Sequence, residues 1–588
     1  MPDKKYPGTN GPSGNGPDRE FTSPGQDIYT SWALGAGRRD FFPDPAQQEW
    51  FTVLLELKGI SALAFAQGED ANGTPLIDVD DFRNTWLASV VVPPLYLREG
   101  DGVKDKLYLT SFVREDFFRE FLERDFGARL RSVVSAVRMG TPPSADPLSS
   151  RILQEDQLVV PTPPVWPDLT GNTPSDGVVV IGIIDDGIAF GHERFWKDEA
   201  RTRIEAVWLQ DRKFNDGVGL QGREFTRSQI DVALASATHG GLIDEDSFYR
   251  DLGAVNFGND TPKSVAKRLS HGAHIMDAAC GLDYRDAGER ALAADRPIVA
   301  VQLPTDSTAD TSGTNLEPYL DAAVYYILYR AHLIAAERGT GPIPVVINFS
   351  YGHHLGAHDG SSISENAIEH RIADRMMTEG VPLRVVVPSG NSHLSRTHAL
   401  IDFDDGTTTK ELLWQIQPDG KTWSFMEVWM PSGSGSSSRL ALTVTSPGGQ
   451  STALVGEGGA RQTLPPSPTS PEEEFCIVEY DVDVSSGRSV FGIKIAPTER
   501  LAPHDDAIAP SGRWTVALTK QALPDGEKIH AWIQRDGPPL GFPIRGRQSY
   551  FDHECYQRYD EYGRPIEIDD PICDIRREGT ISGLATTD

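Results

Sequence analysis

Cysteine is scarce in this chain of 588 residues, which has only four, at positions 280, 476, 555 and 573. Four widely spaced cysteines are too few for a disulfide scaffold, and they lack the CxxC spacing of a zinc site. They favour free thiols in a reducing compartment, with pairing of Cys555 and Cys573 as the alternative. Long apolar runs are also lacking, because the longest candidates, such as 324–336, contain Arg or His. The sequence therefore predicts no membrane span.

Basic residues are also scarce relative to acidic ones. Lys and Arg number 55 against 85 Asp and Glu, for a net charge of -30. This charge repels nucleic acid and anionic membrane surfaces, so neither is expected as a partner. Residues 1–20 are rich in Gly, Pro, Asn and Asp and have no apolar core, so no signal peptide is predicted, and the localisation is cytoplasmic or unknown.

Several domains are expected, because one hydrophobic core does not extend over 588 residues. Changes of composition and of hydrophobic pattern along the sequence predict six regions. They are a disordered lead-in at 1–44, an α+β domain at 45–140, a Pro-rich linker at 141–176, the first part of an α/β domain at 177–400, an inserted β-sandwich or jelly roll at 401–545, and a return to the α/β domain at 546–588.

The α+β domain is predicted from a β-α-β-β-α-β pattern. Its expected elements are strands at 51–57, 90–97, 106–113 and 131–137, with helices at 82–88 and 117–122.

The α/β domain is predicted from four apolar, β-branched runs with helical periodicity between them. The runs are 178–184, 298–303, 345–349 and 383–387. Such runs are typical of strands buried on both faces of a parallel sheet. One helix is expected from Leu320 to Ala335, and another ends at Gly380.

Three segments place polar groups at or just beyond the ends of these strands and helices. Asp185 follows the first strand, His271 begins a helix that Ser270 can cap, and Asn391 lies in a turn after the last strand. Open parallel sheets place their ligand sites at this edge. An acid, an imidazole and an amide donor are what an acyl-transfer enzyme needs besides its nucleophile.

The residues of these segments resemble those of the subtilisin-like serine peptidases, the subtilases. The matching strings are Ile184-Asp-Asp-Gly187, His271-Gly-Ala-His274, Val346-Ile-Asn-Phe-Ser-Tyr-Gly352 and Val386-Val-Pro-Ser-Gly-Asn391. They occur in the family's order and span about residues 175–400. The resemblance implies a subtilisin-like parallel sheet flanked by helices, and peptide-bond hydrolysis with a protein or peptide as substrate.

The resemblance also implies a role for each residue. Asp185 would orient the imidazole, His271 would be the general base and then the acid, and Asn391 would donate to the tetrahedral oxyanion. An edge strand at Ser350, Tyr351 and Gly352 would pair with the substrate backbone, and Ser389 and Gly390 would also contact it.

The nucleophile departs from the family pattern. The one string like Gly-Thr-Ser-Met/Val-Ala is Gly579-Thr-Ile-Ser582, which has an extra residue and only six residues after it. We expect this string to be the strand that precedes the nucleophile segment, with the serine beyond Asp588. A displaced nucleophile at Ser582 and an inactive relative are the alternatives. The 86-residue interval from Asp185 to His271 predicts an insert near 205–265.

The α+β domain looks like the family's propeptide, with an unrelated interaction domain as the alternative. No cofactor is expected; structural calcium is frequent in the family, but no EF-hand-like loop is present. Two other functions stay open. One is an inactive, protease-like binding protein. The other is a metal-dependent hydrolase, suggested by the carboxylates of Asp185 and Asp186 and by a set of histidines: His271, His274, His353, His354 and His358.

Overall fold

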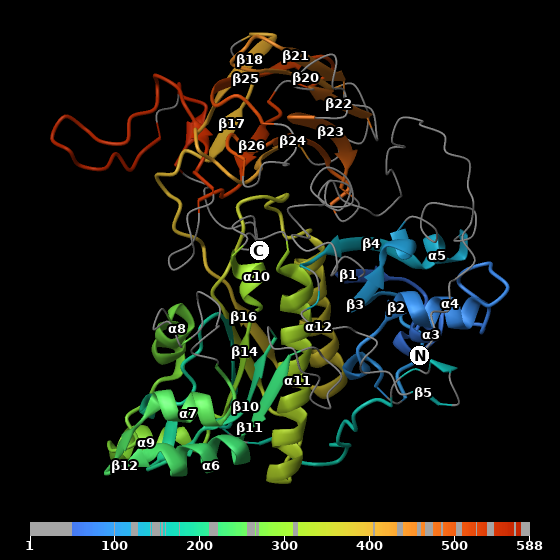
Figure 1. Ribbon diagram of the computed structural model, residues 1–588, viewed down its shortest axis with the longest axis vertical. Helices are drawn as coiled ribbons and strands as arrows, with labels where there is room; N and C mark the ends of the chain where they lie inside the picture. The colour runs from blue at the N-terminus through green and yellow to red at the C-terminus, as the bar shows by residue number, and fades with distance from the viewer. Residues whose placement is uncertain are drawn as a thin grey trace.

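The computed structural model describes residues 50–577 with internal gaps, the longer of which are 119–127, 144–152, 211–221, 256–264, 465–473 and 538–545. It is a mixed α/β structure with several sheets. In Figure 1 the α/β part lies below, a β-rich part lies above it, and the N-terminal part, in blue, lies to one side.

The main sheet has six strands in the order β11-β10-β14-β7-β15-β16, all parallel except β11. Its strands are β11 (Arg223–Thr226), β10 (Ile204–Leu209), β14 (Ile298–Gln302), β7 (Val180–Asp185), β15 (Val345–Phe349) and β16 (Leu383–Val386). The four strands predicted in the α/β domain are present. β10 lies inside the expected insert, yet it pairs with β14 in the main sheet, so that segment is partly sheet.

Helices cover both faces of this sheet, because its strands are apolar on both sides. Helices α11 (Glu317–Arg338) and α12 (Ile363–Glu379) lie on one face. Helices α6 (Arg227–Ala237), α7 (Glu245–Asp251) and α8 (His271–Cys280) pack on the other. Helix α12 begins at a capping box of Ser362 and Glu365. It ends at Gly380, in a left-handed conformation, as its sequence predicts.

The N-terminal part is a four-stranded antiparallel sheet in the order β2-β3-β1-β4. It contains β1 (Trp50–Leu57), α3 (Ala62–Gln67), α4 (Phe82–Ser89), β2 (Val90–Val91), β3 (Leu107–Arg114), α5 (Ala128–Val133) and β4 (Val134–Met139).

Three elements of this part differ from the sequence prediction. The strand expected at 90–97 ends at Val91, because Pro93 and Pro94 follow and a short 3-10 helix begins. The strand expected at 131–137 is a helix up to Val133 and a strand only after it. Helix α3 was not predicted. Of the helix expected at 117–122, Phe117 and Phe118 are buried and the rest lies outside the described residues.

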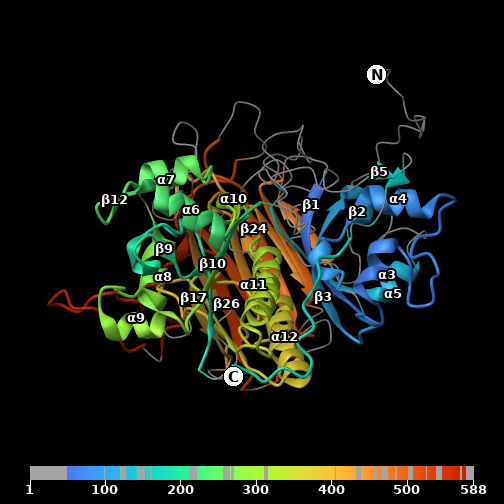
Figure 2. The same cartoon turned by 90° about the horizontal axis from the view of Figure 1, so that it is seen from below.

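The N-terminal sheet packs against α11 and α12, which lie between it and the main sheet (Figure 2). Leu54, Tyr108 and Ala136 form an apolar cluster with Ile363 and Ala367.

A buried polar set joins the same surfaces. The carboxylate of Asp321 on α11 accepts hydrogen bonds from the Tyr96 hydroxyl at 2.7 Å and the Arg371 guanidinium at 2.6 Å. An ionised pair at such a depth requires a fixed arrangement of partners.

The upper part is an antiparallel β-sandwich, as its alternating sequence predicts. One sheet has the order β22-β23-β24-β19-β26-β17-β28 and the other β21-β20-β25-β18-β27. The strands are β17 (His398–Ile401), β18 (Thr409–Ile416), β19 (Ser424–Trp429), β20 (Leu440–Thr445), β21 (Ser451–Val455), β22 (Ala460–Leu464), β23 (Cys476–Val482), β24 (Ser489–Ile495), β25 (Gly512–Lys520), β26 (Ile529–Ile533), β27 (Tyr550–Phe551) and β28 (Ile575–Arg576).

The sandwich extends beyond its predicted limits of 401–545. Strand β17 begins at His398, while β27 and β28 pair with β18 and β17. The described part of 546–588 therefore joins the sandwich, whereas the sequence predicted a return to the α/β domain. The pairing of two-residue strands leaves little sequence signal. Ser582 lies outside the described residues.

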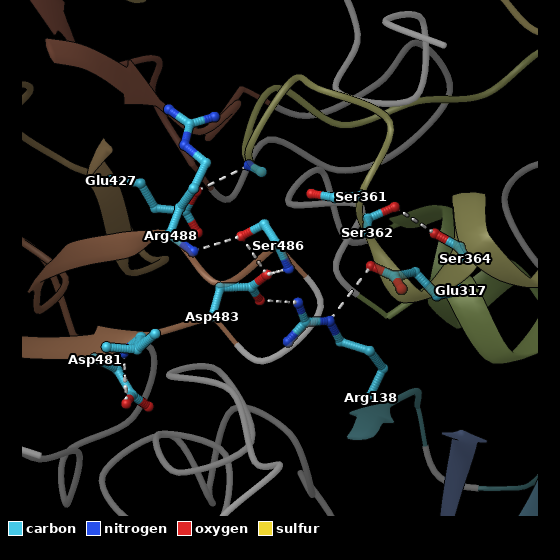
Figure 3. A network of polar contacts seen from close by, with 12 residues as sticks. Arg138, Glu317, Ser361, Ser362, Ser364, Glu427, Asp481, Asp483, Ser486 and Arg488 are labelled. Atoms are coloured by element: carbon cyan, nitrogen blue, oxygen red, sulfur yellow. Dashed lines mark hydrogen bonds and ion pairs between the residues drawn. The ribbon is translucent and has the colours of Figure 1, made fainter. Parts of the chain in front are cut away.

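All three parts meet at Arg138 on β4 (Figure 3). Its guanidinium lies 3.3 Å from the carboxylate of Asp483, between β23 and β24, and 3.8 Å from the carboxylate of Glu317 on α11. Asp483 also accepts hydrogen bonds from the hydroxyl and the backbone N–H of Ser486, both at 2.8 Å. The cation thus lies between acids of two different parts.

Cys555 and Cys573 form a disulfide with a Cα–Cα distance of 5.4 Å, which corrects the expectation of free thiols at these positions. Their spacing of 18 residues gave no sign that the chain folds back on itself there. Cys280 and Cys476 are free. Within the described ranges, no helix has both the length and the apolar character needed to cross a bilayer.

Candidate active site

Asp185 and His271 meet at the carboxyl edge of the main sheet. The Nδ1 atom of His271 lies 2.7 Å from Oδ1 of Asp185. Asp185 is the last residue of β7 and is buried, while the imidazole of His271 is half exposed. The carboxylate is thus fixed inside the protein, while one side of the imidazole is open to solvent.

Local hydrogen bonds fix the position of the aspartate. Oδ1 of Asp185 also accepts from the backbone N–H of Asp186 at 2.8 Å. Its backbone carbonyl accepts from the N–H of Leu303 at 2.8 Å. The next turn is held by Gln302, whose side-chain oxygen accepts from the N–H of Ile188 at 3.1 Å. These contacts keep the carboxylate directed at the edge of the sheet.

Ser270 sets the start of helix α8 and therefore the place of His271. Its side chain accepts from the backbone N–H of Ala273 at 3.2 Å, as expected of an N-cap. Its hydroxyl also donates to the backbone carbonyl of Gly187, which ties the helix to the loop after β7. The sequence predicted the cap, but not this second contact.

Burial raises the pKa of Asp185 above its ordinary value, because a carboxylate is poorly solvated there. The hydrogen bond and the charge of His271 oppose this rise, while the neighbouring Asp186 adds to it. A protonated imidazole beside Asp185 therefore stabilises its ionised carboxylate. A general base reaches this protonated state during catalysis.

Asn391, the expected oxyanion donor, is exposed in the turn after β16. Strand β16 lies two places from β7 in the sheet, and both strands end at the same edge. No hydrogen bond joins Asn391 to Asp185 or His271 in the described part of the chain. The expected substrate contacts Ser389 and Gly390 are exposed beside it, and Gly390 has a φ of 92°, which favours glycine.

Ser350, Tyr351 and Gly352 follow β15 but belong to no described strand, which differs from the edge strand expected here. The Ser350 hydroxyl accepts from Asn348 at 2.7 Å, and the Tyr351 hydroxyl donates to the carbonyl of Thr308 at 3.2 Å. These contacts hold the segment against its own domain. The strand ladder ends at Phe349, where the chain turns toward the sandwich.

His354 contacts the loop that carries Asn391, and the sequence reasoning did not expect this contact. Its Nε2 atom lies 2.7 Å from the hydroxyl of Ser392, the residue after Asn391. Burial lowers the pKa of His354 to about 4, so its ring is neutral at pH 7. The His353-His354 pair was a visible signal, but the partner at 392 depends on the fold.

Among the described residues, one set of side chains at this site could hold a metal ion. Ligand atoms of Asp185, Asp186 and His271 all lie within 4.8 Å of one another. His274, His353, His354 and His358 are not part of this set, so the structure brings together only part of the histidine group that suggested a metal enzyme. The ring of His353 is instead hydrogen-bonded to the backbone carbonyl of Leu355. The ring of His358 is hydrogen-bonded to the backbone carbonyl of His354.

No known family profile matches the sequence, and no curated protein matches it. Several solved structures are similar in part, including the following two. The CspB protease of Clostridium perfringens has 19% identity and a TM-score of 0.43, over 63% of this chain and 64% of that chain. The lipase BlEst2 of Bacillus licheniformis in its propeptide form has 10% identity and a TM-score of 0.16, over 63% of this chain and 76% of that chain. This chain thus spans less than two thirds of the CspB protease, and at these TM-scores neither likeness bears on function.

Proposed function

We propose that this protein is a serine-type endopeptidase of the subtilase kind, in which Asp185 orients His271 as general base. The observation that carries the proposal is the 2.7 Å contact between the buried carboxylate and the half-exposed imidazole. In the proposed arrangement Nδ1–H donates to Asp185, and Nε2 is the ring atom that would take a proton from a nucleophile.

The nucleophile in this proposal is a serine hydroxyl that approaches the open side of His271. Its proton passes to Nε2 as its oxygen attacks the peptide carbonyl, and the imidazolium then gives the proton to the leaving amine. Asn391 would donate to the oxyanion from its turn after β16, and Ser389 and Gly390 would contact the substrate. Ser582 and a serine beyond Asp588 are the two candidates for the nucleophile.

A fluorophosphonate probe and a fluorogenic peptide library test this function together. The probe should label the nucleophilic serine, either Ser582 or a serine in a chain extended past Asp588, and His271→Ala should abolish the labelling. Asp185→Asn should lower kcat by about 10⁴-fold, because the imidazole loses the partner that fixes its tautomer. His239→Ala is a matched control, because His239 is exposed on β12 (Thr238–His239), away from the main sheet. Labelling of Ser582 would identify a displaced nucleophile.

A metal-dependent hydrolase is the second candidate, and the grouping of Asp185, Asp186 and His271 favours it. In that case a chelator would abolish activity, one divalent ion per chain would restore it, and the fluorophosphonate would label no serine. Absence of hydrolysis with both the metal and the full sequence in place would leave a protease-like binding protein.

A further inference from the structure

The segment from Asp552 to Arg577 has little regular structure and depends on a few cross-links. Its described residues contain strand β28 and otherwise turns and irregular chain, including a turn closed by a bridge between Tyr559 and Pro565. The buried Arg577 pairs with Asp569 at 3.3 Å, and the disulfide joins two cysteines that lie 18 positions apart. Segments with so small a core need such a cross-link to stay folded.

His553 lies next to this disulfide. A ring nitrogen of His553 and the sulfur atoms of Cys555 and Cys573 all lie within 4.8 Å of one another. The backbone N–H of Cys555 donates to Nδ1 of His553 at 3.2 Å, which keeps the imidazole beside the sulfurs. Cys573 is buried, Cys555 is half-buried and His553 is exposed, so the group is open on one side only.

We propose that, once the disulfide is reduced, Cys555, Cys573 and His553 form a zinc site. Two thiolates and an imidazole are the donors that Zn²⁺ prefers, and a water molecule would complete the tetrahedron on the open side. The Cα atoms of the two cysteines lie 5.4 Å apart. Once the S–S bond is broken, the sulfurs can move apart until each binds one ion at about 2.3 Å. The metal would then hold the segment as the disulfide does.

The chemistry balances when a phosphine serves as the reductant. The disulfide, the phosphine and one water molecule give two thiols and a phosphine oxide. Each thiol then loses a proton to solvent as its sulfur binds the metal, so binding weakens as the pH falls. Soft thiolates favour zinc over calcium or magnesium, in contrast to the oxygen-rich group at Asp185.

The full chain tests the site by metal analysis after gel filtration, with and without prior reduction by a phosphine. Reduced protein should retain one Zn²⁺ per chain that oxidised protein does not. Co²⁺ added to the reduced protein should give the near-ultraviolet charge-transfer absorption of a thiolate complex. Equal zinc content in both forms, or Co²⁺ spectra without that absorption, would overturn the proposal.

Two variants separate this site from other ligands and from misfolding. His553→Asn retains both cysteines, and its zinc affinity should be at least tenfold weaker. Glu554→Gln is the matched control, an exposed neighbour whose change should leave the affinity unaltered. His271→Ala should bind zinc as the unaltered chain does. Loss of zinc in His271→Ala with full retention in His553→Asn would place the ion at the candidate active site and refute this one.

Discussion

The backbone N–H of Gly272 donates to the carbonyl oxygen of Asp186 across 2.8 Å, so helix α8 rests directly on the loop that follows β7. A β-carbon at position 272 would lie 2.1 Å from that oxygen and 3.0 Å from the β-carbon of Asp185. The approach of the imidazole to its carboxylate therefore requires glycine here.

Gly272→Ala should separate helix α8 from this loop and lengthen the contact between Asp185 and His271. We expect peptidase activity to fall by about 100-fold, with a loss of about 1–3 kcal/mol of unfolding free energy from the overlap. Activity assays and urea unfolding measure the two effects. Gly288→Ala is the control, because its β-carbon meets only a flexible carboxylate at 3.2 Å. Unchanged activity in Gly272→Ala would refute the docking argument.

If the proposed peptidase function holds, His354 should position the loop that carries Asn391, the proposed oxyanion donor. His354→Ala removes the contact with Ser392, so we expect kcat to fall about tenfold with KM little changed, because a displaced donor affects the transition state more than substrate binding. His354→Gln can restore the hydrogen bond and should recover part of kcat. His393→Ala, in the same loop, is the control. A rise in KM at unchanged kcat would argue against this role.

Arg138 should stabilise the junction of the three parts. Arg138→Met removes the cation between Glu317 and Asp483, both mostly buried, and should lower the unfolding free energy by about 2 kcal/mol. Arg201→Met removes an exposed partner of Asp198 and should cost less than about 1 kcal/mol. Denaturant unfolding compares the two variants. Equal costs would show that burial of the junction adds nothing.

His358 should make the protein less stable in acid. Its ring stacks on Trp532 at 3.8 Å, and burial lowers its pKa to about 3 from an ordinary 6.5. Between these values the unfolded chain binds a proton that the folded chain does not, so stability is present above pH 6.5 and is lost as the pH falls toward 3.

His358→Phe retains a stacking ring and removes this titration. The unfolding free energy should then decline less steeply between pH 6.5 and 4, by about 1.4 kcal/mol per pH unit. Urea unfolding at several pH values measures the slope. His393→Asn, at an exposed histidine, is measured in parallel as the control. A slope in His358→Phe equal to that of the unaltered chain would contradict the prediction.

The sequence predicted much of the fold where the signal was local. The β-branched runs at 298–303 and 345–349 are β14 and β15, and the cap at Ser270 begins α8. Prediction was poorest where prolines interrupt an apolar run and where strands are very short. The apolar run at 90–97 continues past two prolines that cannot join a ladder, and β27 and β28 are too short to show a period.

By itself the sequence determined the main strands of the α/β domain and which segments carry an acid, an imidazole or an amide, because periodicity, caps and turns depend on residues a few positions apart. Only the tertiary structure decided that Asp185 meets His271 across 86 residues, that His354 holds Ser392, and that Cys555 pairs with Cys573 beside His553. Such contacts depend on how whole faces of sheets and helices pack, and that packing is set by the combined burial of many side chains.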